Sequence, residues 1–250
     1  MPDLIIIGAG PAGYVAAERA GAAGTSVLLI ERESVLGGVC LNWGCIPTKT
    51  LLACGKTYYQ AKHGASFGVQ APGIRFDWAA AQERKRKVVT GLNQGVAGLM
   101  KKAKAEIVRG AAKLVAKDAV EVAGKTWQAK NILICTGSRP AKPPIPGIDL
   151  PHVVDSTGML DLDTLPQRLV VVGGGVIGLE FACLAASMDV PVTVIEMMSE
   201  VLPGMDAEIA RTARMELEKK GITFHLGAKV TRITAAVVEF TDAKGAAQQA

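Results

Sequence analysis

The sequence predicts an α/β protein built from two similar units in tandem, the second of which looks truncated. Three observations lead to this prediction: a glycine-rich motif that occurs twice, an acidic residue at the same distance after each copy, and a proline-rich segment between the copies. Hydrophobic residues make up 49% of the 250 positions. That share is enough for a buried core and excludes a disordered chain.

Each copy of the motif joins an apolar, β-branched run to small residues that suit a helix packed on a sheet. The first copy reads DLIIIGAGPAGYVAA and the second reads RLVVVGGGVIGLEFA. Both predict a strand, a tight turn and a helix. The glycines are Gly8, Gly10 and Gly13 in the first copy, and Gly173, Gly175 and Gly178 in the second.

This glycine spacing is typical of a Rossmann-like dinucleotide-binding turn. The first glycine permits the tight turn, the second lets the backbone approach a pyrophosphate, and the third lets helix and strand pack closely. The helix N-terminus then offers unpaired N–H groups to the phosphates. Because the motif occurs twice in the same context, we prefer this interpretation to glycine-rich turns in a catalytically silent α/β protein.

An acidic residue completes each motif. Glu31 ends SVLLIE and Glu196 ends VTVIE, each 23 positions after the first glycine of its copy. We expect both carboxylates to accept hydrogen bonds from ribose hydroxyls. Glu196 would repel a 2′-phosphate, and no arginine follows it within residues 197–199. The second copy therefore favours NAD over NADP.

The remaining elements are expected around these motifs. Strands are expected at residues 106–110, 112–117, 119–123 and 131–137 after a helical pattern over residues 77–104. A second helix is expected from about Asp206 to Lys220, where Gly221 suits the position after its end. Strand candidates follow in FHLGAKVTRI and VVEFTD, and the closing KGAAQQA offers no strand equivalent to NILICTG.

A proline-rich segment separates the two motifs. Residues 138–151, SRPAKPPIPGIDLP, contain five of the 12 prolines. Proline fixes φ and cannot donate to a strand ladder, so we expect a semi-rigid linker and a domain boundary here. The expected domains are residues 1–145 and residues 146–250.

Charge, hydropathy and cysteine content exclude several classes of protein. The formal net charge is +5, and the basic runs 84–87 and 101–104 are interpreted as solvated helix faces, since aromatic residues make up only 4%. We therefore expect no nucleic-acid partner. No apolar run reaches the length of a membrane span. Five cysteines and no cationic leader favour a cytoplasmic protein over a secreted disulfide scaffold.

Two cysteines lie in the stretch LGGVCLNWGCIPTKT. Cys40 and Cys45 are separated by four residues, and Lys49 follows them at an expected helix start. A metal site needs about four ligands and none accompany this pair, so we expect no metal. Reversible disulfide chemistry is favoured over buried structural thiols. Cys54, Cys135 and Cys183 are interpreted as small core residues.

GGVCLNWGCIPTK resembles the redox-active motif of the class I flavin-dependent pyridine nucleotide–disulfide oxidoreductases, and within them the dihydrolipoamide dehydrogenase branch. GAGPAG, ICTGSRP, GGGVIGLEFA and VTVIE match the family in order and spacing, over essentially all 250 residues. The resemblance implies FAD on residues 1–145 and NAD on residues 146–250. It implies electron transfer from a dihydrolipoyl dithiol to a Cys40–Cys45 disulfide, then to FAD, then to NAD. A related disulfide reductase with another substrate and a catalytically silent nucleotide-binding fragment remain alternatives.

The resemblance also implies roles for individual residues. Cys40 would be the interchange thiol, and Cys45 would lie beside the flavin as the charge-transfer thiolate. Lys49 would sit near the flavin N5 edge and pair with Glu180, which would shield a buried ammonium. The other implied contacts are Gly38, Ala112, Thr136, Gly137 and Ser138 to FAD, and Val230 to NAD.

Partners and length follow from the same resemblance. The implied partner is a lipoyl-bearing protein of a 2-oxo acid dehydrogenase or glycine cleavage complex, and the full-length form is expected to be a homodimer. The family continues beyond this sequence with the rest of the NAD unit, a returning FAD segment and an interface domain carrying a His–Glu pair. Both units are therefore expected to be incomplete, and the 250-residue chain alone is expected to be inactive.

Overall fold

The computed structural model describes residues 1–250, which form two compact units. Unit 1 comprises residues 1–47 and 85–139, and unit 2 comprises residues 48–84 and 140–250. Helices α3 (Cys45–Lys62) and α4 (Trp78–Lys102) each have residues in both units. This division differs from the expected one because residues 48–84 group with the second half of the chain. In unit 2, for example, the Trp78 indole donates to the Leu162 carbonyl at 2.8 Å.

Unit 1 is organised around a four-stranded parallel sheet. Its strand order is β3 (Glu106–Arg109), β2 (Val27–Glu31), β1 (Leu4–Ile7) and β7 (Asn131–Ile134). The helices are α1 (Pro11–Ala22), α2 (Gly38–Trp43) and the second half of α4. A separate antiparallel sheet contains β4 (Lys113–Ala116), β5 (Ala119–Val122) and β6 (Lys125–Gln128).

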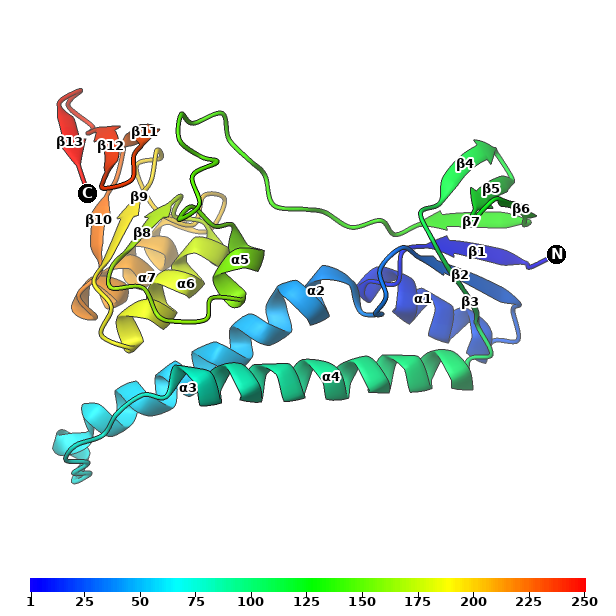
Figure 1. Cartoon of the computed structure of the whole chain (residues 1–250), viewed down its shortest axis with the longest axis horizontal. Helices are drawn as coiled ribbons and strands as arrows, with labels where there is room; N and C mark the ends of the chain where they lie inside the picture. The colour runs from blue at the N-terminus through cyan, green and yellow to red at the C-terminus, as the bar shows by residue number, and fades with distance from the viewer. The chain divides into compact units, whose positions relative to one another are not determined.

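Both faces of the parallel sheet in unit 1 are covered, as Figure 1 shows. Side chains alternate along a strand, so neighbouring residues face opposite sides. Ile6 and Leu29 pack with α1 and α4, whereas Ile5 and Leu28 pack with β5. Burial on both faces explains why the central strands are continuous apolar runs.

Unit 2 repeats this arrangement on a smaller scale. Its parallel sheet has the order β10 (Thr223–His225), β9 (Val192–Ile195) and β8 (Leu169–Val172). Its own helices are α5 (Ser156–Leu160), α6 (Val176–Ser187) and α7 (Ala207–Lys219), with a 3₁₀ turn η1 at Gly64–Phe67. An antiparallel sheet contains β11 (Lys229–Ile233), β12 (Val238–Thr241) and β13 (Ala247–Gln249).

The core of unit 2 is layered in the same way. Val194 of β9 packs with α6 on one face of the parallel sheet. Ile195, the next residue, packs with Val230 and Phe240 of the antiparallel sheet on the other face. The predicted α/β class and the duplicated strand–turn–helix unit are therefore confirmed.

Several expected elements have the expected bounds. The helix expected over residues 77–104 is α4, and the helix expected from Asp206 is α7. The Asp206 side chain accepts two backbone N–H groups at the start of α7, and Gly221 follows its end with φ +87°. Burial of Lys85, which is 6% exposed, contradicts the prediction of a fully solvated run at residues 84–87.

Five short elements were not predicted: α2, η1, β6, α5 and β13. Strand β6 completes a hairpin with β5, and helix α5 has only five residues, capped by Asp155. Strand β13 pairs antiparallel with β12 and lies outside the parallel sheet of unit 2, so it is not the equivalent of β7, the strand NILICTG of unit 1. Its sequence, AQQ, is polar and fully exposed, and an edge strand of this kind gives no alternating hydrophobic signal.

The proline-rich segment contains no helix or strand, but its second half is not a loose linker. Ile145, Ile148 and Leu150 pack against the core under β11 and β12. The Ile233 N–H donates to the Pro146 carbonyl at 2.8 Å. The packed part of this segment therefore belongs to unit 2. None of the helices combines the length and the apolar character that a membrane crossing requires.

Candidate dinucleotide and disulfide site

Two glycine loops of nearly the same geometry follow β1 and β8. The first glycine of each loop has a left-handed backbone, with φ +102° at Gly8 and +106° at Gly173. A Cβ on Gly13 would lie 1.8 Å from the Gly8 carbonyl oxygen, and a Cβ on Gly178 would lie 2.5 Å from that of Gly173. The third glycine therefore permits the helix to pack on the turn, as predicted.

The middle glycine of each loop leaves space instead of filling it. A Cβ on Gly175 would meet no atom within 4 Å, and one on Gly10 would meet only the Gly38 Cα at 3.7 Å. Neither glycine provides a side-chain cap to the helix that it precedes. The N–H groups of α1 and α6 thus face a gap without a protein side chain, and this geometry fits a dinucleotide pyrophosphate.

The two acidic residues make the same pair of hydrogen bonds. Oε2 of Glu31 accepts from the Ala9 N–H at 2.8 Å, and Oε2 of Glu196 accepts from the Gly174 N–H at 2.5 Å. The other oxygen of each accepts the N–H two residues further along the chain, at 3.0 and 2.7 Å. Each carboxylate is only 7% exposed.

This second role of the glutamates was not predicted from the sequence. Each carboxylate ties the end of a strand to the glycine loop before it, in addition to any ligand contact. A carboxylate oxygen has two lone pairs, so a single backbone hydrogen bond leaves each oxygen able to accept another. The contact to ribose therefore remains a prediction that this geometry permits.

The helix that carries Cys40 begins against the first glycine loop. Gly38, the first residue of α2, has φ +59°, and a Cβ on it would lie 2.5 Å from the Gly10 Cα. The Gly37 N–H donates to the Ala9 carbonyl at 2.9 Å. Only glycine allows two backbones to approach so closely. Gly38 is therefore where the cysteine segment contacts the loop.

The two cysteines lie on either side of a helix break. Gly44 separates α2 from α3, and a Cβ on Gly44 would lie 3.4 Å from the Cys40 Cα. Gly44 thus still packs on the last turn of α2, and Cys45 begins α3 directly after it. Cys40 is half-buried, Cys45 is exposed, and both sulfurs are thiols in this structure.

Asn42 stabilises this turn, and sequence reasoning did not identify it. Its amide nitrogen donates to the carbonyls of Leu36 and Gly38, each at 2.9 Å, and its oxygen accepts from Asn93 of α4 at 2.6 Å. An asparagine inside the CLNWGC stretch was the available signal, because asparagine is a poor helix former that bonds well to turn backbone.

The predicted approach of Lys49 and Glu180 is confirmed. Lys49 Nζ donates to Glu180 Oε1 at 2.6 Å, and both residues belong to unit 2. The expectation of a buried ammonium is wrong, because the side chains are 57% and 24% exposed. Lys49 lies one turn after Cys45 on α3, and Glu180 lies in the second turn of α6.

The remaining predicted contacts lie at the edges of the loops. Thr136, Gly137 and Ser138 form an exposed stretch after β7, and Gly137 has φ +67°. Ala112 is partly buried beside the core cluster under β5. Val230 pairs with a residue of β12, and its side chain is buried. No contact in the structure tests their assignment to FAD or NAD.

Cys135 behaves as the small core residue that was expected. It follows β7, and its carbonyl oxygen would lie 2.3 Å from a Cβ on Gly8. Burial raises the pKa of the Cys135 thiol, which disfavours the reactive thiolate. The backbone of Cys135 therefore joins the end of β7 to the first glycine loop.

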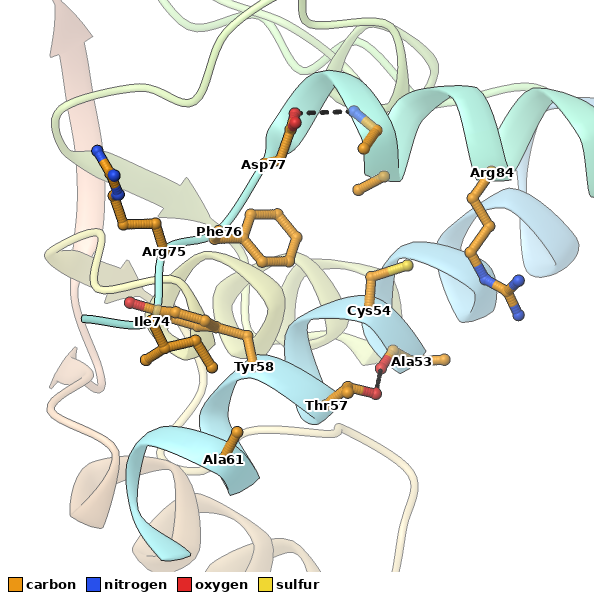
Figure 2. Close-up of a pocket in the computed structure, with 12 residues that line it drawn as sticks. Ala53, Cys54, Thr57, Tyr58, Ala61, Ile74, Arg75, Phe76, Asp77 and Arg84 are labelled. Carbon is orange, nitrogen blue, oxygen red and sulfur yellow. Dashed lines mark hydrogen bonds between the residues drawn. The ribbon is translucent and has the colours of Figure 1, made fainter. Parts of the chain in front are cut away.

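A hollow of about 510 Å³ lies apart from these residues, between α3 and the start of α4. Figure 2 shows Tyr58 and Phe76 beside it, with ring centroids 5.6 Å apart in an edge-to-face arrangement. Cys54 and Arg84 also line it. None of the residues predicted to bind a nucleotide or carry out redox chemistry is among its lining residues.

Comparison with known proteins gives consistent results. The pyridine nucleotide-disulphide oxidoreductase family model matches residues 2–248. The chain is 46% identical to dihydrolipoyl dehydrogenase of Mycoplasma pneumoniae, over 92% of this chain and 51% of that protein. It is 42% identical to dihydrolipoyl dehydrogenase of Acholeplasma laidlawii, over 92% of this chain and 70% of that protein.

A solved structure is similar over nearly the whole chain. The HOCl-induced flavoprotein disulfide reductase RclA from Escherichia coli aligns with a TM-score of 0.82 and 33% identity, covering 99% of this chain and 54% of that one. The present chain thus spans about half the length of RclA and of the Mycoplasma protein.

Proposed function

The chain belongs to the pyridine nucleotide-disulphide oxidoreductase family, and on this premise we propose that it is a portion of a dihydrolipoyl dehydrogenase. FAD would bind at the first glycine loop and NAD at the second. A dihydrolipoyl dithiol would be oxidised to its disulfide while the Cys40–Cys45 disulfide is reduced to two thiols. Bound FAD would supply the step that takes two electrons from these thiols and delivers them as hydride to NAD⁺, with release of a proton.

The observation that carries this proposal is the start of α2 against the first glycine loop. The backbone of Gly38 contacts that of Gly10, and Cys40 follows two residues later on α2. A thiol pair held this close to a dinucleotide turn is suited to electron exchange with the nucleotide bound there. This proximity favours the redox role over a silent nucleotide-binding role.

The chain's own residues would perform distinct tasks. Cys40 would attack or release the substrate sulfur, and the exposed Cys45 would exchange electrons with the flavin. Lys49, held by Glu180 at 2.6 Å, would place a positive charge one turn from Cys45. This places the Lys49–Glu180 pair beside the thiol that would exchange electrons with the flavin.

Glu196 supports NAD as the electron acceptor. Its carboxylate is nearly buried beside the open second loop, and no arginine lies within the next three residues. A 2′-phosphate placed there would meet like charge without a compensating guanidinium. NADH is therefore expected to bind more tightly than NADPH, and equal affinities in a calorimetric titration would contradict the assignment.

The partner proposed for the whole protein is a lipoyl-bearing subunit of a 2-oxo acid dehydrogenase or glycine cleavage complex. The names of the relatives support this partner class. A homodimer and a cytoplasmic location are part of the same proposal. They rest on the family resemblance and on the redox thiol pair.

The function can be tested with the 250-residue chain loaded with FAD. Dihydrolipoamide is added without oxygen, followed by NAD⁺, and the flavin spectrum is recorded after each addition. We expect the flavin to be reduced and then reoxidised once, with at most one NADH formed per flavin, while sustained turnover stays absent as expected for the 250-residue chain. Cys45→Ser should abolish reduction by dihydrolipoamide, whereas the control Cys54→Ser, which removes another thiol of α3, should retain it.

The alternatives give different results in the same experiment. A silent nucleotide-binding protein would bind FAD and NADH but would show no flavin reduction that depends on Cys45. A related disulfide reductase would respond to another thiol, such as glutathione, and not to dihydrolipoamide. Alkylation and peptide mass analysis should also locate an air-formed disulfide between Cys40 and Cys45.

A further inference from the structure

Helix α6 ends with an aspartate where other helices of this protein have glycine. The backbone N–H groups after α6 donate to Ala185 and Ala186, the paired bonds of a Schellman turn, and Asp189 occupies the left-handed position with φ +65°. Helices α1 and α7 end in the same turn, with Gly24 and Gly221 at this position.

Aspartate is locally unfavourable at this position for two reasons. Its Cβ makes the left-handed conformation costly, whereas glycine adopts it without strain. Its negative charge also lies at the negative end of the helix dipole. When a residue opposes its local environment in this way, the compensating interaction is to be sought elsewhere in the fold.

The compensating interactions come from helix α3. Asp189 Oδ2 accepts the Tyr58 hydroxyl at 3.0 Å and Lys62 Nζ at 2.6 Å. The bond from Lys62 is the largest of several causes that lower the pKa of Asp189, and the same bond raises the pKa of Lys62. Tyr58 and Lys62 are one helical turn apart, so Asp189 binds one face of α3.

Helix α3 contacts the α6 segment at three positions along its length. Lys49 pairs with Glu180 near the start of both helices. A Cβ on Gly55 would lie 3.2 Å from the Leu184 side chain, so the helices also approach closely midway. The Asp189 contacts follow at the end. Residue numbers rise together on both helices, so the helices run in the same direction within unit 2.

The Lys49 contact cannot by itself fix this arrangement. Its ammonium is largely exposed, and an exposed ion pair stabilises a structure only weakly. The Lys62–Asp189 pair is exposed to a similar degree, so the contact at Asp189 depends on the Tyr58 hydroxyl as well as on Lys62. From Lys49 to Lys62 the helix rises by about 20 Å as a rigid rod. A shift of one residue along α3 would move the backbone of Lys49 by about 1.5 Å relative to Glu180 and so disturb its 2.6 Å contact.

We propose that Asp189 is a positioning residue which, by holding Tyr58 and Lys62, sets the position of α3 along α6 and so keeps Lys49 at Glu180. Its relevance to electron transfer rests on the proposed function, because Cys45 lies one turn before Lys49 on the same helix. The anchoring itself does not depend on any cofactor. Asp189 lies at the opposite end of α3 from these residues and acts through the helix.

The test is limited lysine acetylation of the 250-residue chain, measured for each lysine by mass spectrometry. An amine that is held in a hydrogen bond to a carboxylate is less available to the acetylating reagent than a free one. In Asp189→Gly, which suits the left-handed turn, Lys62 should react at least threefold faster. Lys49 should also react at least threefold faster, approaching its rate in Glu180→Gln.

Two matched controls accompany this variant. Lys130 pairs with Asp3 in unit 1 at 2.6 Å and is 66% exposed, close to the values for Lys49, and its rate should not change. Lys104→Gly makes the same substitution after α4, where φ is +54°, and should leave Lys49 unaffected. Asp189→Asn tolerates the turn and can still accept the Tyr58 hydroxyl, so it should partly restore the low rate of Lys49.

Three results would overturn the proposal. Faster labelling of Lys62 with Lys49 unchanged would mean that Asp189 merely secures the end of α3. Unchanged rates at Lys49 and Lys62 would mean that Asp189 does not hold Tyr58 and Lys62 in solution. If Lys130 also reacts faster, Asp189→Gly has unfolded the protein, and the Tyr58→Phe variant is measured instead. An unchanged rate of Lys49 in Tyr58→Phe refutes the positioning role. None of these labelling measurements requires FAD. Failure of the positioning role can therefore be distinguished from failure of the proposed function, which is tested by flavin reduction.

Discussion

The second and third glycines of the second glycine loop, Gly175 and Gly178, should respond in opposite ways to the same added methyl group. In Gly178→Ala the new Cβ would lie 2.5 Å from the Gly173 carbonyl oxygen and 3.0 Å from a methyl group of Val171. Both are fixed parts of β8 and its turn, so α6 must move away from the sheet. In Gly175→Ala the new Cβ meets no atom within 4 Å.

The expected magnitudes follow from these contacts. Forcing a methyl group into a packed site costs about 1–3 kcal/mol. For a chain of this size each kcal/mol lowers the unfolding midpoint by roughly 2–4 °C, so Gly178→Ala should lower it by about 2–12 °C. Gly175 has φ −73° and ψ 172°, which alanine adopts freely. Its substitution should change stability by less than about 1 kcal/mol, since reduced chain entropy offsets a weaker helix cap.

Nucleotide binding should show the reverse order. The methyl group of Gly175→Ala would occupy the space where the pyrophosphate is expected, at a comparable cost of about 1–3 kcal/mol, or roughly 5–150-fold in affinity. Differential scanning fluorimetry and calorimetric titration with NADH measure the two effects. The reasoning would be refuted if Gly175→Ala destabilised the protein and left NADH affinity unchanged.

Three further substitutions test other parts of the structure. Lys130→Met should raise the pKa of Asp3 from about 2 toward its usual 3.8, because the bond from Lys130 is the main cause of the lowering. A carboxyl group whose pKa is lowered in the folded state stabilises the fold at pH values above its pKa in the unfolded chain. The difference in unfolding free energy between wild type and variant, measured by urea unfolding, should therefore shrink from pH 5 to pH 2. A constant difference would count against this. Asp206→Ala removes the cap that accepts two N–H groups of α7 and should cost about 0.5–2 kcal/mol in the same assay; no change would exclude the cap. Gly38→Ala should lower both the unfolding midpoint and FAD retention more than Gly24→Ala does. Gly24 also has a positive φ, but a Cβ on it would meet no atom within 4 Å. Equal effects would mean that backbone strain, and not the contact with Gly10, determines the result.

The parts predicted well from the sequence are those that depend on local spacing. The glycines at positions 8 and 173 require a left-handed backbone, and those at positions 13 and 178 require close packing. These requirements act over a few residues, so the order of residue types reveals them. The caps of α7 were predictable for the same reason.

The parts that escaped prediction depend on contacts between distant segments. The hydrogen bonds that Glu31 and Glu196 accept from the loop amides join residues 22 positions apart. The sequence shows where each acidic residue lies but not which N–H group it will accept. Grouping of residues 48–84 with unit 2 depends on packing of α3 along α6, which neither helix reveals alone. The exposure of Lys49 likewise depends on what surrounds the ion pair rather than on its two members.

The two glycine loops differ in one respect that bears on how each would hold its nucleotide. The first loop is met by the backbone of Gly38 at the start of α2, whereas the second has open space beside Gly173 and Gly175. A ligand at the first loop would therefore lie beside the segment that carries Cys40. A ligand at the second loop would meet no such segment within its unit. This asymmetry suits a resident electron carrier at the first loop and an exchangeable nucleotide at the second, even though both loops are held by the same glutamate hydrogen bonds.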